Sequence, residues 1–384
     1  MIKESTMEKT SLTSNWEYGT LEDALNKGSS NISLNKVKED DGEYKLYSAK
    51  GYNKNISFFH QEKEYLAIIK DGAGIGRVSK HPAKSSVVAT MQYLIPKEGF
   101  DIGFVQYFLN GIDFESHRQG STIPHVYFKD YKSEPFPLLP LAQQKQIVFA
   151  LDKAFVAIDT AKANAEQNLQ NAKELFQSYL QNIFENRGAD WEFLPFGDVC
   201  EISGGSQPPK PTFIYEPKDG YIRLIQVRDY RTIKFITYIP KEKAKKFCNK
   251  TDIMIGRYGP PIFGIFRGLE GAYNVALMKA IPNKNLLNQE YLYWFLKTPT
   301  LVKFIEKSSK RAAGQDGVRK DLLYKYSTPI PSLSEQMQIA QKLDVLLLKT
   351  KKLEAIYTQK IADLEEMKKS VLQKAFSGQL NTLN

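Results

Sequence analysis

Several basic and amide side chains lie in stretches rich in glycine, proline and asparagine, where turns are expected. The set in the first half is Arg77, Lys80, Lys84, His117, Arg118 and Gln119, and the set in the second half is Lys210, Arg228, Arg231, Arg257, Tyr258, Arg311, Gln315 and Arg319. Such groups donate hydrogen bonds to base edges, and the basic ones also neutralise phosphates. We therefore treat them as candidate nucleic-acid contacts; the alternative for each is a solvated surface charge.

Signatures of catalysis are missing from the sequence. There is no [ND]-P-P-[YF] methyltransferase signature, and "YGPP" from Tyr258 resembles it only in part. No G-x-x-x-x-G-K-[ST] phosphate loop occurs, and "GAGIGR" from Gly72 is a partial glycine pattern that favours a turn after a strand. We expect no catalytic residue and no bound cofactor.

The histidines and cysteines lack the spacing of metal ligands. They are His60, His81, His117, His125, Cys200 and Cys248. Two cysteines are too few for a disulfide framework and indicate reduced thiols in a cytoplasmic protein. We expect the histidines on the surface, exposed or facing nucleic acid, and we expect no metal site.

The charge balance favours a polyanionic partner. Lysine and arginine number 53 against 43 acidic residues, which gives a net charge of +10. Nucleic acid and anionic membranes are the usual partners of such a surplus. No apolar run approaches the ~20 residues that span a bilayer. The opening "MIKESTMEKTSLTSNWEY" also lacks the apolar core of a secretory signal.

The elements that must position these side chains contain an internal repeat. "PLAQQKQIVFALD" begins at Pro140 and "SLSEQMQIAQKLD" begins at Ser332, an offset of 332 − 140 = 192. Gln144 then matches Gln336, and the register continues without a gap until Phe184 matches Phe376. An internal repeat of this kind indicates a duplicated architecture.

Both copies predict a long helix. Neither contains proline or glycine, each follows a proline-rich entry, and apolar residues recur at steps of three and four. The first seam is Ile147, Leu151, Ala154, Ile158, Ala161, Ala165, Leu169, Ala172, Phe176, Tyr179 and Ile183, and the second is Ile339, Leu343, Leu346, Thr350, Leu353, Tyr357, Ile361, Leu364, Lys368, Val371 and Ala375. Small residues in the first seam match large ones in the second. We expect an antiparallel coiled coil within one chain; the alternative is that each helix packs on its own globular domain.

The remaining segments predict two globular domains. Residues 1–136 and 188–328 contain short apolar runs separated by glycine, proline and asparagine, as in mixed α/β domains. They look like diverged duplicates, because "DGAGIGRV" from Asp71 has a counterpart in "GRYGPPIFGIFRG" from Gly256. The expected fold is α+β, with two mixed α/β domains (1–136 and 188–328) separated by two helical regions (137–187 and 329–384) that form an intramolecular antiparallel coiled coil.

This organisation resembles the specificity (S) subunit of Type I restriction–modification systems. The most specific residues are the paired "PLLPLAQQKQIVFALD" and "PIPSLSEQMQIAQKLD" segments, which look like the proline-rich entry into that family's conserved helices. "WEFLPFGDVCEISGGSQPP" followed by "GYIRLIQVRDY" is similar to the opening of a target-recognition domain. "NWEYGTLEDALNKGSS" in the first half departs from the pattern, because it lacks the usual glycine- and proline-rich stretch.

The resemblance implies a non-catalytic DNA-recognition subunit. Each globular segment would be a target-recognition domain that binds one half of an asymmetric, bipartite target in double-stranded DNA. The helices would hold the two domains apart and dock two methyltransferase (M) subunits, and the complete enzyme would add endonuclease/translocase (R) subunits. Half-sites in successive major grooves lie ~34 Å apart, a spacing that a stiff rod holds better than a flexible linker.

Two other functions fit the sequence. One is a scaffold protein whose coiled coil and globular domains bind proteins. The other is a free-standing DNA-binding regulator without methyltransferase partners. Basic residues gathered on one face of each globular domain would favour DNA recognition over the scaffold, whereas an even scatter would favour the scaffold.

Overall fold

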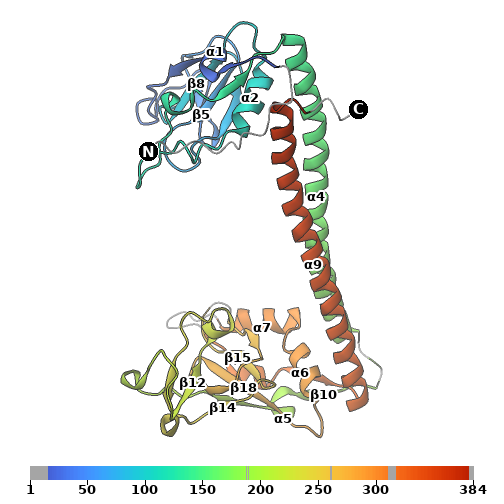
Figure 1. Cartoon of the computed structure of the whole chain (residues 1–384). Helices are drawn as coiled ribbons and strands as arrows, with labels where there is room; N and C mark the ends of the chain where they lie inside the picture. The colour runs from blue at the N-terminus through green and yellow to red at the C-terminus, as the bar shows by residue number, and fades with distance from the viewer. Residues whose placement is uncertain (1–15, 187, 189, 260–261, 310–316, 380–384) are drawn as a thin grey trace. The chain divides into compact units, whose positions relative to one another are not determined.

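The computed structural model describes residues 16–186, 188, 190–259, 262–309 and 317–379 (Figure 1). It divides into two compact units. The first unit contains the described residues up to Glu166 together with those from Gln359 onward, and the second runs from Gln167 to Thr358. Each unit therefore combines a globular part with portions of two long helices, α4 (Leu141–Glu185) and α9 (Leu333–Phe376).

Over residues 16–137, the globular part of the first unit contains three small sheets. One is antiparallel, in the order β2 (Leu25–Ser29), β8 (Met91–Pro96), β5 (Tyr65–Ile69) and β6 (Val78–His81). The second has the order β4 (Gly51–Ile56), β3 (Tyr44–Ser48) and β7 (Ser85–Val87), with β3 parallel to β7. The third pairs β1 (Tyr18–Thr20) with β9 (Pro135–Pro137). The helices are α1 (Leu21–Ala24), α2 (Ile102–Gly111), which contacts β5 and β6, and α3 (Phe128–Tyr131).

The globular part of the second unit has a matching plan. Its first sheet has the order β11 (Cys200–Gly204), β18 (Leu277–Pro282), β15 (Ile253–Gly256) and β16 (Ile265–Phe266). Its second has the order β13 (Tyr238–Pro240), β12 (Tyr221–Ile225), β17 (Gly271–Tyr273) and β14 (Phe247–Cys248), with β12 parallel to β17. Its third pairs β10 (Glu192–Pro195) with β19 (Ser327–Ile330).

Short helices complete the second unit. They are α5 (Phe196–Val199), α6 (Gln289–Phe295), α7 (Pro299–Ser309), α8 (Lys320–Tyr324) and the 3₁₀ turns η1 (Lys210–Thr212), η2 (Val227–Tyr230) and η3 (Lys241–Lys243). Both units thus contain an antiparallel four-stranded sheet, a sheet with one parallel pair and a two-stranded ribbon. The expectation of two diverged duplicates in an α+β fold is confirmed.

The two long helices pair in an antiparallel sense. In the first unit Lys162 forms an ion pair with Glu365, and Lys368 Nζ lies 2.9 Å from Asp159 Oδ1, so partner numbers fall along one helix as they rise along the other. In the second unit Lys342 Nζ lies 5.9 Å from the Tyr179 ring. The predicted pairing within one chain is confirmed.

The predicted seams are correct only in part. Phe155, Leu180 and Phe184 lie outside the predicted seam, yet each is more buried than the adjacent seam residue (Ala154, Tyr179 and Ile183) and belongs to the core of a globular part. Leu353, placed in the second seam by its spacing, is 44% exposed, so that assignment is wrong. The spacing of apolar residues predicts which face of a helix is buried. The globular part that packs on the helix then determines which residues at the margin of that face are buried.

A buried glutamine in each copy of the repeated phrase makes the same junction in its unit. In the first unit the Asp101 backbone N–H donates to Gln144 Oε1 at 2.8 Å, and Gln144 Nε2 donates to the carbonyls of Gly99 (3.0 Å) and Leu139 (2.7 Å). Asp101 is also the N-cap of α2, where its side chain accepts from Gly103 N and Phe104 N. One side-chain amide therefore joins the start of α4 to the start of α2.

The second unit repeats this arrangement. The Asn288 backbone N–H donates to Gln336 Oε1 at 2.7 Å, and Gln336 Nε2 donates to the carbonyls of Leu286 (2.8 Å) and Pro331 (2.9 Å). Asn288 is the N-cap of α6. Both glutamines are 0% exposed, so the bonds replace those that water would otherwise make.

The far end of each long helix packs on the other globular part. Phe376, near the end of α9, lies 5.1 Å from the Phe104 ring and 5.4 Å from the Phe108 ring in the first unit. Phe184, near the end of α4, lies 5.3 Å from the Tyr291 ring in the second. Each globular part is therefore built on the beginning of one helix and the end of the other.

Candidate nucleic-acid interface

Three loops of the first unit come together beyond β5. The Gly72 N–H donates to the Pro124 carbonyl at 2.9 Å, and His125 Nδ1 lies 2.8 Å from Asp71 Oδ1. Arg77 donates to the Ala49 carbonyl in the turn between β3 and β4. The segments 71–77, 117–125 and 48–51 are thus held beside one another.

The structure gathers some of the first-half candidates at these loops. Arg77 and Gln119 are exposed there, and Gln119 exchanges two 2.8 Å backbone hydrogen bonds with His125. Arg118 is exposed and 3.3 Å from Glu115. His117 differs, since its Nε2 lies 2.9 Å from Glu134 Oε1 with both side chains mostly buried, so it is a structural partner.

The other two first-half candidates lie further along the chain. Lys80, on β6, is 3.1 Å from Glu64. Lys84 follows β6 and is exposed, with φ at +51°. A positive φ at a lysine is uncommon outside tight turns. We find no contact in the described chain that joins these two lysines to the loops beyond β5.

The histidine expectation fails at His81. This side chain is 5% exposed, its ring stacks on Tyr65 at 5.3 Å, and its Nε2 lies 2.8 Å from Ser79 Oγ. Burial lowers the pKa of His81 to about 4, because removal from water disfavours the charged form. His81 is a neutral core residue and not a surface group.

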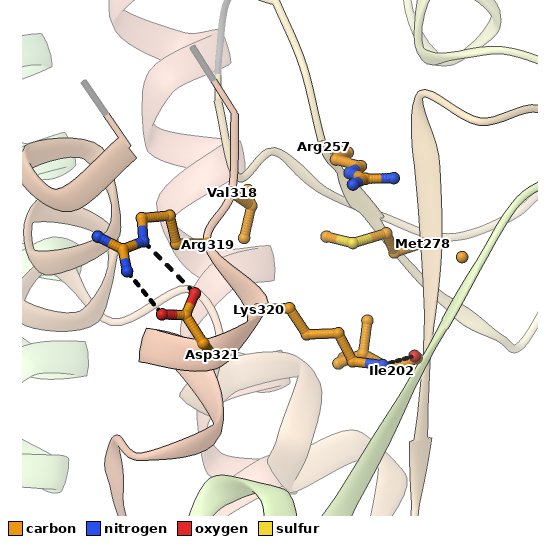
Figure 2. Close-up of a pocket in the computed structure, with 8 residues that line it drawn as sticks. Ile202, Arg257, Met278, Val318, Arg319, Lys320 and Asp321 are labelled. Carbon is orange, nitrogen blue, oxygen red and sulfur yellow. Dashed lines mark hydrogen bonds and ion pairs between the residues drawn. The ribbon is translucent and has the colours of Figure 1, made fainter. Parts of the chain in front are cut away.

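The corresponding loops of the second unit also meet. Tyr258 forms an isolated antiparallel bridge with Gly317, and the Val318 N–H donates to the Arg257 carbonyl at 3.0 Å. A hollow of about 420 Å³ has Arg257, Met278 and Arg319 among its lining residues. Figure 2 shows how these side chains lie around it. The structure therefore places three of the second-half candidates, Arg257, Tyr258 and Arg319, close to one another.

These three candidates differ in their partners. Arg319 makes two hydrogen bonds to Asp321, at 3.4 and 2.6 Å, which lower the pKa of that carboxyl. The Arg257 guanidinium instead lies over the Tyr258 ring at 4.9 Å. Figure 2 shows it well apart from the Arg319–Asp321 pair.

The remaining second-half candidates lie elsewhere. Lys210 is exposed at the start of η1. Arg228 donates to the Phe235 carbonyl at 3.3 Å and packs over the Phe235 ring at 5.6 Å, and Arg231 is exposed beyond η2. Arg311 and Gln315 lie outside the described residues.

Two residues that the sequence analysis missed occupy the place equivalent to Arg257 and Tyr258. The Lys70 N–H donates to Thr90 O at 3.0 Å, as the Arg257 N–H donates to Ala276 O at 2.8 Å. The Lys70 carbonyl accepts from Val126 N, as the Arg257 carbonyl accepts from Val318 N. Asp71, next to Lys70, is then the counterpart of Tyr258. The likeness of "DGAGIGRV" to "GRYGPPIFGIFRG" was the sequence signal for this pair.

The buried acid of the second unit has an unusual environment. Asp229 lies 3.7 Å from Arg223, yet burial raises the pKa of its carboxyl because loss of water outweighs the attraction of the two nearby arginines. The thiols of Cys200 and Cys248 are buried and free, and burial raises their pKa to about 12 and about 11. Thiols of that kind are unreactive.

The described residues contain neither a candidate metal site nor a candidate membrane span. Across the ranges given above, no group of three or more His, Cys, Asp or Glu side chains is arranged to hold a metal ion. Over the same ranges, no helix combines the length and apolar character needed to cross a bilayer.

The duplicated fold, with loops gathered beyond a central strand in each unit, defines a class of proteins in which two similar globular parts are built on two long antiparallel helices. A model of the family described as the Type I restriction modification DNA specificity domain matches residues 13–170 and, again, residues 188–365. The chain belongs to this family.

Known relatives agree with that assignment. The chain is 25% identical over 297 residues to the EcoBI specificity subunit of a Type I restriction enzyme from Escherichia coli, covering 67% of this chain and 61% of that subunit. It is 24% identical over 328 residues to the EcoKI specificity subunit from E. coli K12, covering 78% of this chain and 70% of that subunit. The chain thus spans less than two thirds of the EcoBI subunit.

A solved structure shares the fold. It is a chain from work on the complex assembly and conformational transition of the Type I restriction–modification system. The two chains superpose with a TM-score of 0.76 at 17% identity, covering 95% of this chain and 98% of that one.

Proposed function

We propose that this chain is the DNA-recognition subunit of a Type I restriction–modification enzyme. Each unit binds one half of an asymmetric, bipartite target in double-stranded DNA, and the paired helices dock two methyltransferase (M) subunits. Residues 1–136 and 188–328 serve as target-recognition domains, and residues 137–187 and 329–384 as the conserved helical regions. The subunit itself is non-catalytic, and endonuclease/translocase (R) subunits join in the complete enzyme.

The observation that carries the bipartite target is a shared backbone frame with different side chains. Lys70 and Asp71 in the first unit stand where Arg257 and Tyr258 stand in the second. Equivalent frames would approach DNA in equivalent ways, while unlike donors and acceptors would select unlike bases. An asymmetric target follows from that difference.

Exposed apolar residues on the long helices support docking of two copies of one partner. Long helices of a chain without such a partner would carry polar residues at exposed positions. Three exposed apolar positions recur at the offset of 192, with exposures of 41% and 40%, 68% and 70%, and 67% and 53%. The pairs are Leu141 with Leu333, Val156 with Leu348, and Leu175 with Met367.

Selection from a randomised duplex pool tests the proposal. The full chain is used with and without a co-expressed methyltransferase subunit, at two salt concentrations. Two short motifs at a constant gap are expected to be enriched. Strongly salt-dependent binding with no motif would leave a basic protein that associates with DNA without sequence preference. No binding in any condition would reject DNA recognition and favour a scaffold.

A further inference from the structure

Nearly every arginine side chain in the described residues interacts with another group of the chain. Arg77, Arg118, Arg223, Arg228, Arg267 and Arg319 each have a hydrogen bond or ion pair to a carbonyl or carboxylate, and Arg231 is engaged as well. Within the residues that the structure describes, the Arg257 guanidinium has no hydrogen bond or ion pair and only a ring contact with Tyr258. Its N–H donors are open to a ligand.

The position of Arg257 is fixed although its donors are open. It directly follows β15, a strand whose residues are all buried. Its backbone N–H and carbonyl are held by bonds of 2.8 and 3.0 Å to Ala276 and Val318. The guanidinium lies over the Tyr258 ring at 4.9 Å, at the edge of the hollow in Figure 2. A stacked guanidinium keeps its plane, so little order is lost when its fork of donors binds.

The first unit has different chemistry in this place. Lys70 Nζ lies 3.4 Å from Asp71 Oδ2, and Asp71 also holds His125 at 2.8 Å. The basic group there is neutralised by a carboxylate. In the second unit Tyr258 and Gly317 stand where Asp71 and His125 stand, so no neighbouring carboxylate occupies Arg257. The backbone frame is kept while its charge pattern is changed.

We propose that Arg257 determines the specificity of the second unit by recognising a guanine, donating to N7 and O6 in the major groove. This inference rests on the proposed function. Those two acceptors match the spacing of the guanidinium fork, and lysine cannot reproduce the planar pair of bonds. A phosphate contact needs positive charge but no fixed plane, and so would not call for the stacked tyrosine.

The test uses three variants of the full chain in the same duplex selection. Arg257→Lys keeps the charge and loses the fork, and Arg257→Ala removes both. Arg267→Lys is the matched control, since that arginine belongs to the same unit but pairs with Glu290 and is not among the candidate nucleic-acid contacts. Thermal unfolding checks that all three remain folded.

We expect the Arg257 variants to change the preference at a single base pair of the target. Both Arg257 variants lose the preference for one guanine in one half-site, by about 10- to 100-fold, while the other half-site and the gap are unchanged. Replacing that guanine by 7-deazaguanine weakens wild-type binding by about tenfold and leaves Arg257→Ala unaffected. Arg267→Lys retains the whole motif.

Three results would overturn the inference while the proposed function stands. The motif could survive in Arg257→Ala, the affected half-site could lack guanine, or Arg257→Lys could behave like wild type while Arg257→Ala weakens all sequences equally, as a phosphate contact does. Failure of the wild-type chain to enrich any motif would instead reject the proposed function, and this inference with it.

Discussion

Gln144 and Gln336 make the same three hydrogen bonds in two units whose other side chains differ. Each amide satisfies one backbone N–H and two carbonyls at a buried junction. A buried group left without its partner costs about 1–3 kcal/mol. The junction between a long helix and its globular part therefore depends on a single side chain in each unit.

We expect Gln336→Leu to lower the free energy of unfolding of the second unit by about 3 kcal/mol, because it leaves the Asn288 N–H and two carbonyls unpaired. Urea unfolding of the full chain measures the change. Gln338→Leu, two residues along the same helix and exposed, is the control and should cost no more than about 0.5 kcal/mol. Equal losses in the two variants would show that the junction does not depend on this amide.

His81 links the stability of the first unit to pH. Its pKa is about 4 in the folded chain and near 6.5 in an unfolded one. Between those values the unfolded state binds more protons, so the stabilising contribution is fully present above pH 6.5 and is lost as the pH falls toward 4. Acid should therefore weaken this unit before most carboxylates titrate.

We expect the free energy of unfolding of the first unit to fall by about 1 kcal/mol from pH 7.5 to pH 5.5 through this group. The His81 ring lies 4.6 Å from the Tyr47 ring and 5.3 Å from the Tyr65 ring. The His81→Phe variant keeps a ring in contact with both tyrosines but cannot bind a proton, so its decline should be smaller by that amount. Hydrogen exchange of the β5 amides at both pH values measures the difference. A variant that declines as steeply as wild type would refute the assignment.

At the level of elements, the long helices were predictable and the loops were not. Leu151 lies in α4 and Leu343 in α9, and each helix is continuous. The recurrence of apolar residues every three or four positions is therefore enough to predict both helices. The meeting of Tyr258 with Gly317 depends on strand pairing between segments far apart in sequence. No local pattern encodes such a contact, so Lys70 and Asp71 could have been located only by aligning "DGAGIGRV" with "GRYGPPIFGIFRG".

The same limit explains the histidines. Neither His81 nor His117 lies in a local pattern that distinguishes a buried position from an exposed one. His81 is buried because β6 pairs with β5 and places it against Tyr65. His117 is covered because it meets Glu134, which lies in another loop.

The exposed apolar positions of the helices predict how partners bind. Replacing Val156 or Leu348 by glutamate should each remove one methyltransferase subunit from the complex, and the double variant should bind none. Both side chains are about two thirds exposed, so the stability of the chain should change by no more than about 0.5 kcal/mol. Native mass spectrometry of co-expressed complexes gives the stoichiometry.

Gln341→Glu is the matched control for this experiment. It adds the same charge at an exposed position of α9 without removing an apolar group. If it disrupts the complex as strongly as Leu348→Glu, then added charge and not loss of apolar contact is responsible.

At the scale of the whole molecule, the helices are proposed to set the gap between half-sites. Deleting residues 167–173 from α4 and residues 354–360 from α9 removes seven residues from each helix at matched antiparallel positions. Seven residues correspond to ~10 Å of helix, or about three base pairs at 3.4 Å each. The enriched motif should keep both half-sites and lose about three base pairs of spacer.

Deleting residues 167–173 alone provides the comparison for that experiment. It shifts α4 against α9 and should impair folding instead of shortening the spacer. A gap that stays constant in the double deletion would mean that something other than helix length sets the spacing.

The division of the helices between the units also has a consequence for synthesis on the ribosome. The core of the first unit includes Leu372, Ala375 and Phe376, whereas the second unit is complete at Thr358. Between Glu166 and Phe376 the ribosome adds 376 − 166 = 210 residues, which takes roughly 10–40 s at bacterial rates. The globular part of the first unit is therefore synthesised before the second unit but completes its core after it. During that interval the side of Phe104 and Phe108 that Phe376 packs against stays uncovered. Chaperones would have their main effect in this time window.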